Sequence, residues 1–197
     1  SFELGHDVFH CYKRTGHGRV ALEMALIQSC DVYFYNVGVD LGIDRIAKYA
    51  RAMGLGDKLG FGLNREEAGN VPTNAARKKQ TGHPWNLGDT PSIAIGQGAN
   101  LVTPLQLASV YSTIANGGSI WRPFIVRKVT NNMGETIDEH QPDLIRKVSV
   151  ISQQHFDYVR RALQRVVDTP GGTGARAAVA GYTVGGKTGT AQVVALK

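Results

Sequence analysis

Hydrophobic positions recur every three or four residues in five stretches of the chain, which is the spacing of helices with one buried face. Most of these stretches end at a glycine, or at an asparagine followed by glycine, as is typical of helix C-termini. The helices predicted in this way cover residues 20–28, 32–41, 43–53, 104–115 and 153–169.

The last two predicted helices also carry signals at their N-termini. Thr103 precedes Pro104 and lies three residues before Gln106, which combines a capping threonine, a proline at the first helical position and the partner of a capping box. Ser152 occupies the capping position of the final helix. These signals predict where both helices begin.

Strands are predicted where β-branched and aromatic residues replace the helical spacing. Phe124–Thr130 and Glu135–Asp138 bracket Asn131–Gly134, a turn of the kind that joins hairpin strands. Tyr182–Val194 predicts a further hairpin or strand pair. Helices first, then strands with helices between them, indicate an α+β fold with an antiparallel sheet.

Two segments lack clear periodicity. The first 17 residues are expected to be irregular. Residues 54–92 are rich in glycine, asparagine, proline and charge, and are expected to form a long loop. Trp85 within that loop is expected to be a core plug beneath it rather than a wall of a substrate groove.

The composition narrows the classes of function. With 197 residues, of which 42% are hydrophobic and 19% charged, the chain fits a folded domain and not a disordered tail. The net charge of +6 is spread over short basic runs without a recognisable module, so nucleic-acid binding is not expected. A solvated basic surface, or an anionic small substrate, fits that charge better. No stretch approaches the ~18 uninterrupted apolar residues of a spanning helix.

Cysteine and histidine give little sign of a metal or a disulfide framework. Cys11 and Cys30 are expected to be free thiols, although an oxidising compartment would allow them to pair. His6 and His10 are four residues apart without a third ligand nearby, so a zinc site is not expected.

The stretch from Lys187 to Gln192, K-T-G-T-A-Q, carries the clearest chemistry. A glycine between two threonines leaves one face of an extended segment open to a ligand. The ammonium of Lys187, the hydroxyls of Thr188 and Thr190 and the backbone at Gly189 together suit a carboxylate and a developing oxyanion. The alternative is an edge strand with a solvated lysine.

A second candidate is Ser29-Cys30-Asp31, at the junction of two predicted helices. Ser29 and Asp31 could face one cleft while Cys30 points inward. The alternative is that Asp31 caps the next helix. A third stretch, Ile95–Asn100, contains a glycine pair but completes neither of the phosphate-binding glycine motifs.

The order S-x-D, I-G-Q-G, T-P-L-Q and K-T-G-T-A-Q resembles the transpeptidase domain of class B penicillin-binding proteins, whose signatures include S-D-N and K-T-G. Residues 85–90, Trp-Asn-Leu-Gly-Asp-Thr, and residues 16–18, Gly-His-Gly, are most similar to the penicillin-binding protein 2 branch. The resemblance covers essentially the whole chain.

The resemblance implies a peptidoglycan D,D-transpeptidase that works through a serine acyl-enzyme and is trapped by β-lactams. It implies that Ser29 relays a proton to the leaving group, that Asp31 orients the general-base lysine, and that Lys187 supplies positive charge. Thr188 and Thr190 would bind the substrate carboxylate beside Gly189, and the backbone N–H of Thr190 would form half of the oxyanion hole.

The sequence departs from the family pattern in two ways. It contains no S-x-x-K, so residues 1–197 are expected to be a partial transpeptidase domain, with the nucleophile helix upstream, the last sheet strands downstream and no activity alone. Asp31 stands where the motif has asparagine, and an ionised carboxylate can only accept hydrogen bonds.

The resemblance further implies a periplasmic catalytic domain anchored in the bacterial inner membrane. Its partners would be stem peptides ending in D-Ala-D-Ala, a membrane glycan polymerase and rod-shape scaffold proteins, and it would need no metal or organic cofactor. Two alternatives remain: a hydrolase on the same fold, either a D,D-carboxypeptidase or a β-lactamase, and a non-catalytic sensor or scaffold module.

Overall fold

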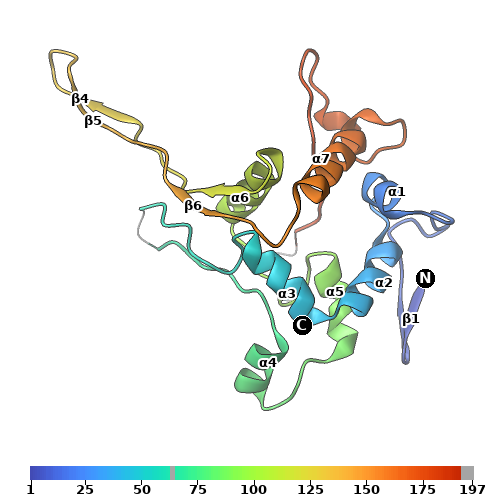
Figure 1. The fold of residues 1–197 in the computed structure, drawn as a ribbon. Helices are drawn as coiled ribbons and strands as arrows, with labels where there is room; N and C mark the ends of the chain where they lie inside the picture. Colours follow the sequence, from blue (N-terminus) through green and yellow to red (C-terminus); the bar gives the residue numbers. More distant parts are fainter. Residues whose placement is uncertain (63–64, 192–197) are drawn as a thin grey trace.

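The computed structural model of the protein describes residues 1–62 and 65–191. The helices surround the centre of the molecule, and one long hairpin projects from it (Figure 1). The helices of this part are α1 (Leu22–Ile27), α2 (Asp31–Leu41), α3 (Ile43–Ala52), α4 (Asn74–Thr81), α5 (Thr90–Ala94), α6 (Pro104–Ala115) and α7 (Gln153–Asp168), with 3-10 turns η1 (Leu87–Asp89) and η2 (Ala175–Ala177).

The five predicted helices are confirmed as α1, α2, α3, α6 and α7. The capping box before α6 is also present: the Thr103 hydroxyl accepts from Gln106 N at 3.1 Å, and Gln106 Oε1 accepts from Thr103 N at 2.8 Å. Ser152 caps α7 as predicted. Because these signals are local in sequence, they fix the helix ends without reference to the rest of the fold.

The helix that begins with Asp31 packs most closely on α5. Gly38 in α2 is the point of closest approach, because a Cβ at this position would overlap the Cβ of Ala94. Helix α7 lies against α1 and α6, burying Phe156, Ala162 and Val166. Helix α1 also contacts α2, so the four helices α1, α2, α5 and α7 form one packed group.

The strands form three separate antiparallel pairs instead of one sheet. In each pair the two strands run antiparallel, and the pairs are β1 (Phe2–Leu4) with β2 (Asp7–Phe9), β3 (Ser119–Trp121) with β6 (Leu144–Lys147), and β4 (Lys128–Thr130) with β5 (Thr136–Glu139). The α+β class with antiparallel pairing is therefore confirmed, with the strands distributed among the helices.

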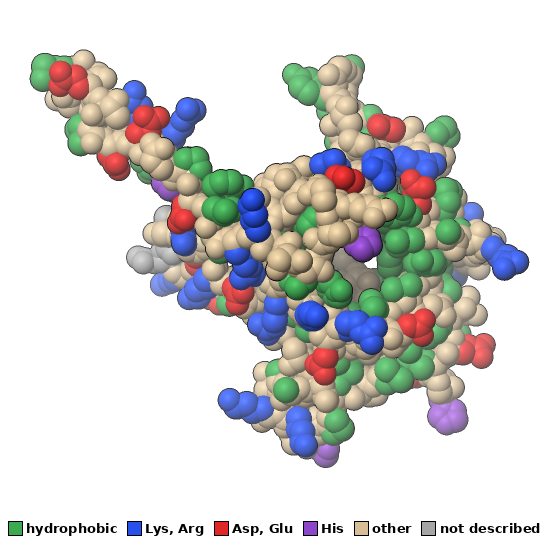
Figure 2. Space-filling model, viewed as in Figure 1, with side chains coloured by type: hydrophobic (Ala, Val, Ile, Leu, Met, Phe, Trp, Pro, Cys, Tyr) green, Lys and Arg blue, Asp and Glu red, His purple; other side chains and the backbone are tan. Residues whose placement is uncertain are grey.

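Strand β3 belongs to the core and β4 does not. Ile120 of β3 packs with Val148 and Phe156 in a buried cluster. The β4–β5 ribbon instead stands away from the body, and every residue of both strands is exposed (Figures 1 and 2). We call residues 124–140, which contain this ribbon, the arm.

The first predicted strand of the arm was too long, the second begins one residue later than predicted, and the region contains two further strands. The turn is confirmed, because Gly134 N donates to Asn131 O at 3.0 Å. The strands cover only residues 128–130 and 136–139, and the segments on either side contribute β3 and β6, which pair with each other. The pairing of β3 with β6 joins segments that are distant in sequence, which explains why local composition did not predict it.

The prediction of an irregular beginning is confirmed for residues 10–17 and was wrong for residues 2–9. Phe2–Leu4 and Asp7–Phe9 form a hairpin, and the rings of Phe2 and Phe9 lie 6.2 and 5.6 Å from the ring of Tyr35 in α2. Burial of aromatic surface against α2 thus stabilises a strand pair too short to be recognised alone.

The prediction of a long loop over residues 54–92 was also wrong, because the segment contains α4, η1 and the start of α5. Helix α4 has no buried residue, so it lacks the apolar stripe by which a helix is predicted from sequence. Its ends carry the local signals: the Thr73 hydroxyl accepts from Ala76 N at 3.0 Å, and Gly82 is left-handed. Trp85, half-buried beside it, donates from Nε1 to Thr90 Oγ1 at 2.9 Å.

The tail differs most from its prediction. Residues 182–191 contain no strand, and residues 192–194 of the predicted strand pair lie outside the described residues. The tail follows α7 instead, since Gly186 N donates to Leu163 O at 3.1 Å. Within the described part of the chain, no helix has the length and apolar character needed to cross a membrane.

Candidate functional site

Ser29 lies in the sharp turn between α1 and α2. Its φ of +52° is in the left-handed region, which is uncommon for any residue except glycine. The turn is closed by backbone hydrogen bonds from Ser29 N to Leu26 O at 3.3 Å and from Cys30 N to Ala25 O at 2.9 Å. A strained conformation held by a packed surrounding is a feature of functional positions, and here it fixes the direction of the Ser29 side chain.

Asp31 is the first residue of α2, and the position before it, Cys30, is the N-cap. The alternative prediction, that Asp31 caps this helix, is therefore wrong. Its Oδ2 accepts a hydrogen bond from Tyr12 N at 3.0 Å, and the Tyr12 hydroxyl donates to Gln28 O at 2.8 Å. The carboxylate is thus held by the segment that enters α1.

Lys187 reaches Ser29 across 158 positions of sequence: its Nζ donates to Ser29 Oγ at 2.5 Å. The same nitrogen donates to the backbone oxygen of Thr188 at 3.1 Å. Burial lowers the pKa of Lys187 below its ordinary value of 10.5, and the negative charge of Asp31 opposes part of that shift. The two sequence motifs that contain Ser29 and Lys187 therefore meet in one site.

A third hydroxyl, that of Thr173, completes the group. Thr173 Oγ1 lies 3.0 Å from Ser29 Oγ, and Thr188 Oγ1 donates to it at 2.9 Å. Ser29 Oγ and Thr188 Oγ1 are 3.2 Å apart, so the three oxygens form a triangle beside the ammonium. We call Ser29, Thr173 and Thr188 the hydroxyl triad.

Sequence analysis missed Thr173. It lies in Gly172-Thr173-Gly174, directly after α7, and that triplet repeats the threonine–glycine pairing of the lysine motif. The triplet was a signal of an open backbone next to a hydroxyl. Its relation to Ser29 depends on tertiary packing, which local sequence does not encode.

The triad opens into a cavity of about 720 Å³. Leu26, Phe34 and Ile95 give it an apolar side, and Gln97 of the third sequence motif also lines it. The remaining polar lining contains all six residues predicted for the site together with Thr173 and Tyr12: Ser29, Asp31, Lys187, Thr188, Gly189 and Thr190. No atom comes within 4 Å of the place a Cβ would take at Gly189, so this position leaves room for a ligand.

The arrangement suits the binding of an anion next to a hydroxyl that can transfer a proton. A cation and hydroxyl donors face one cavity, where they can bind a carboxylate and stabilise negative charge that develops on oxygen. Ser29 contacts an ammonium and two hydroxyls at once, so it can accept a proton and donate its own.

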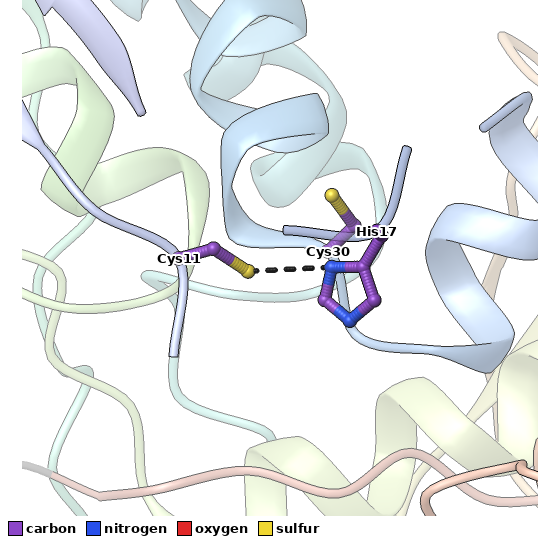
Figure 3. A group of neighbouring side chains, drawn as sticks. All are labelled: Cys11, His17 and Cys30. Carbon is purple, nitrogen blue, oxygen red and sulfur yellow. Dashed lines mark hydrogen bonds between the residues drawn. The ribbon is translucent and has the colours of Figure 1, made fainter. Parts of the chain in front are cut away.

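Cys11, His17 and Cys30 form a second cluster, and Cys30 lies between Ser29 and Asp31 in the chain (Figure 3). Both cysteines are buried free thiols, as predicted. Cys11 Sγ lies 3.5 Å from His17 Nδ1, and one potential donor atom from each residue lies within 4.8 Å of the others. Thiolate and imidazole are ligands that zinc accepts, so these three residues, and not His6 and His10, could hold a metal ion.

The surroundings of Cys30 favour its protonated thiol. Burial raises the pKa of Cys30 above its ordinary value of 9.0, with Cys11 adding to the shift. Burial likewise lowers the pKa of His17 below 6.5, aided by Lys13. Cys30 and His17 are therefore largely uncharged at neutral pH, and a metal ion bound by the Cys30 thiolate would have to displace its proton.

Comparison with known proteins shows the family of the chain. Residues 2–197 match the family model described as the penicillin binding protein transpeptidase domain. The chain is 36% identical over 190 residues to the peptidoglycan D,D-transpeptidase MrdA of Haemophilus influenzae, covering 96% of this chain and 29% of that protein. The chain thus spans less than a third of this curated relative.

Solved structures of penicillin-binding proteins and of a peptidoglycan synthase complex have a similar fold. The fold is similar to that of penicillin-binding protein 2 in its complex with MreC from Helicobacter pylori, with a TM-score of 0.82, 33% identity and coverage of 98% of this chain and 34% of that one. It is also similar to a chain of a peptidoglycan synthase complex that coordinates polymerization and crosslinking, with a TM-score of 0.76, 33% identity and coverage of 94% and 30%.

Proposed function

Because this chain belongs to the penicillin-binding protein transpeptidase domain family, we propose that it is part of a peptidoglycan D,D-transpeptidase of the penicillin-binding protein 2 type. The observation that carries the proposal is the hydrogen bond from Lys187 Nζ to Ser29 Oγ at the mouth of the cavity. It joins the two motifs that an acyl-transfer site of this family requires.

In the proposed reaction, a serine nucleophile outside residues 1–197 attacks the carbonyl of the penultimate D-Ala of a stem peptide. A lysine base takes the proton of that serine, and the terminal D-Ala leaves as an amine. The acyl group then passes to the amine of a second stem peptide, which restores the serine. Residues of this chain bind the donor peptide and move a proton to the leaving nitrogen.

Ser29 is the proposed relay. Its hydroxyl gives a proton to the leaving nitrogen and receives one from Lys187 Nζ, with which it is already hydrogen-bonded. The number of protons on Ser29 is unchanged by the step. Burial assists the transfer, because it lowers the pKa of Lys187 and makes the ammonium a stronger acid.

Substrate binding is assigned to the residues after Lys187. The Lys187 ammonium and the hydroxyls of Thr188 and Thr190 would bind the terminal carboxylate of D-Ala-D-Ala, which β-lactams reproduce. The backbone N–H of Thr190 would supply one donor to the oxyanion, and the open space at Gly189 allows the peptide to approach. Asp31 would orient the lysine base.

The proposed setting is the periplasmic face of the bacterial inner membrane. A relative of known structure was solved with MreC, and another in a complex that coordinates polymerization and crosslinking. We accordingly propose a rod-shape scaffold protein and a membrane glycan polymerase as partners. The chemistry proposed for the site requires no organic cofactor.

The test is covalent labelling of the full-length protein by benzylpenicillin, read by intact mass, beside residues 1–197 alone. We expect a single adduct on the full-length protein and none on the shorter chain. An adduct on the shorter chain would show that the nucleophile has been assigned wrongly. No adduct on either would favour a non-catalytic module.

A matched pair of variants tests the relay. Ser29→Ala should slow acylation of the full-length protein by about 100-fold or more, the range of general acid–base catalysis. The control, Ser112→Ala, makes the same change at an exposed position of α6 and should acylate normally. Rapid hydrolysis of the adduct would indicate a β-lactamase, and release of D-Ala from a pentapeptide without cross-linking would indicate a D,D-carboxypeptidase.

A further inference from the structure

Thr173 is the one member of the hydroxyl triad to which the lysine and serine motifs give no role. Its hydroxyl contacts both motif hydroxyls, at 3.0 Å from Ser29 Oγ and 2.9 Å from Thr188 Oγ1. It also lies outside the cavity's carboxylate-binding segment in sequence, since it precedes Lys187 by an entire loop. A residue placed in this way can act on the motif residues without itself being the relay.

The position of Thr173 is fixed from two sides. Its backbone N–H donates to Ile27 O at 3.1 Å, which ties it to the buried last residue of α1. Gly172 and Gly174 on either side lie against the end of α7, and a Cβ at Gly172 would overlap the carbonyl of Val166. The segment therefore cannot shift much relative to α1 and α7, and Thr173 is a rigid reference point for the triad.

Counting protons gives the direction of the hydrogen bonds. A threonine hydroxyl has one proton and two acceptor positions. Thr173 donates its proton to Ile27 O through a long hydrogen bond of 3.4 Å and accepts from Thr188 Oγ1. One acceptor position then remains, and Ser29 Oγ is the neighbouring hydroxyl at 3.0 Å.

Ser29 needs such an acceptor. Its oxygen already accepts from Lys187 Nζ, so its own proton must be donated elsewhere. From these contacts we infer that Thr173 is a positioning residue. In the resting site Thr173 Oγ1 accepts a hydrogen bond from the Ser29 hydroxyl, and this bond holds Ser29 Oγ in the rotamer that faces Lys187. The inference rests on the proposed function, in which Ser29 relays a proton.

The role follows from the geometry of a short side chain. Serine has one heavy-atom torsion, and its three staggered rotamers point Oγ in different directions. Without Thr173 the Ser29 hydroxyl can donate to Thr188, 3.2 Å away, or turn toward solvent. In most of these arrangements Ser29 is no longer ready to take a proton from Lys187 while it releases its own.

The experiment uses the full-length protein and benzylpenicillin, with the binding constant and the acylation rate constant measured separately. Thr173→Val replaces the hydroxyl by a methyl group of similar shape and should slow acylation about tenfold, the effect expected from one hydrogen bond lost in the transition state. Binding should change less than about threefold, because Thr173 is not a carboxylate-binding residue.

Two further variants separate positioning from packing. Thr173→Ser retains the hydroxyl and should acylate within about threefold of the unmodified protein. Thr136→Val makes the same substitution at an exposed position of β5, outside the cavity lining, and should be unaffected. Thermal unfolding of each variant should confirm that the fold is retained.

The inference is overturned if Thr173→Val acylates as fast as the unmodified protein, or if Thr173→Ser is as slow as Thr173→Val. The first result would show that the hydroxyl is dispensable, and the second that the methyl group carries the effect. Absence of labelling in the unmodified protein would instead overturn the proposed function, and the inference with it.

Discussion

At the scale of single residues, the charge state of Lys187 is set by its surroundings. Burial lowers its pKa below 10.5, and the carboxylate of Asp31 only partly restores it. The ammonium is therefore lost at a lower pH than that of a free lysine. Since the proposed relay draws a proton from this ammonium, the pH dependence of acylation should show when it disappears.

We expect the rate of penicillin acylation of the full-length protein to fall in the alkaline range at a pH below 10.5, where a free lysine would still be protonated. Lys187→Arg stays protonated over this range, so the ratio of the unmodified rate to the variant rate should decrease with pH. A constant ratio would contradict the role of the ammonium.

Stability gives an independent check of the same shift. Between the lowered pKa and 10.5, the unfolded chain binds more protons than the folded one, so the free energy of unfolding rises with pH. Relative to Lys187→Met, the unmodified protein should therefore gain stability over this window, measured by denaturant unfolding.

Asp31 is held by Tyr12 N through Oδ2, and an asparagine can accept that same hydrogen bond. We expect Asp31→Asn to acylate within about tenfold of the unmodified protein, and Asp31→Ala, which removes the acceptor, to be slower. The measurement is penicillin labelling over time. A loss of more than about 100-fold in Asp31→Asn would show that the charge itself is required.

At the scale of elements, α2 and α5 meet where neither can carry a larger side chain. Asp31 begins α2, and Ile95, directly after α5, lines the cavity, so their packing sets the width between them. We expect Gly38→Ala to lower the free energy of unfolding by about 2 kcal/mol, because its Cβ would overlap that of Ala94.

The matched control is Ala94→Gly in the Gly38→Ala background. Removing the opposing methyl group should recover part of the lost stability, less the cost of about 1 kcal/mol for a new helical glycine. The two changes should therefore be coupled in a double-mutant cycle measured by denaturant unfolding. Purely additive effects would mean that the two helices separate to admit the methyl group.

The elements also show which features a sequence can predict. Thr103 and Gln106 fix the start of α6 through contacts three residues apart, and the same holds for Ser152 and α7. The pairing of β3 with β6 and the hairpin under Tyr35 depend on contacts between distant segments. Local periodicity could not reveal them, and it missed α4 because that helix buries no face.

The same distinction applies to the site. Ser29, Asp31, Lys187 and Thr188 lie within short motifs whose residue types already indicate their chemistry, and all four line one cavity. Thr173 has no such motif, and its contribution comes from the tertiary contact of its segment with Ile27 at the end of α1. The Lys187 segment was predicted to be a strand because it is rich in β-branched residues, but the structure has no strand over residues 182–191.

At the scale of the whole molecule, the arm and the cavity are separate. The cavity lies among α1, α2, the residues after α5 and the tail, whereas the arm extends from the opposite side of the body (Figure 1). Phe124 and His140 stack at its base, with ring centroids 4.0 Å apart, and His140 N donates to Arg127 O at 2.8 Å. Beyond these contacts, the strands of the arm pack mainly on each other.

The arm can therefore be shortened without disturbing the site. Replacing residues 128–139 by Asn-Gly retains the stack at the base and closes the ribbon with a hairpin turn. Because every residue of the removed strands is exposed, the free energy of unfolding should change by less than about 0.5 kcal/mol. Acylation of the full-length protein by penicillin should stay within about twofold, since no residue of the arm lines the cavity. If the variant unfolds more easily, the ribbon supports β3 and β6. If it folds normally but acylates slowly, the arm and the hydroxyl triad are coupled through the body of the molecule.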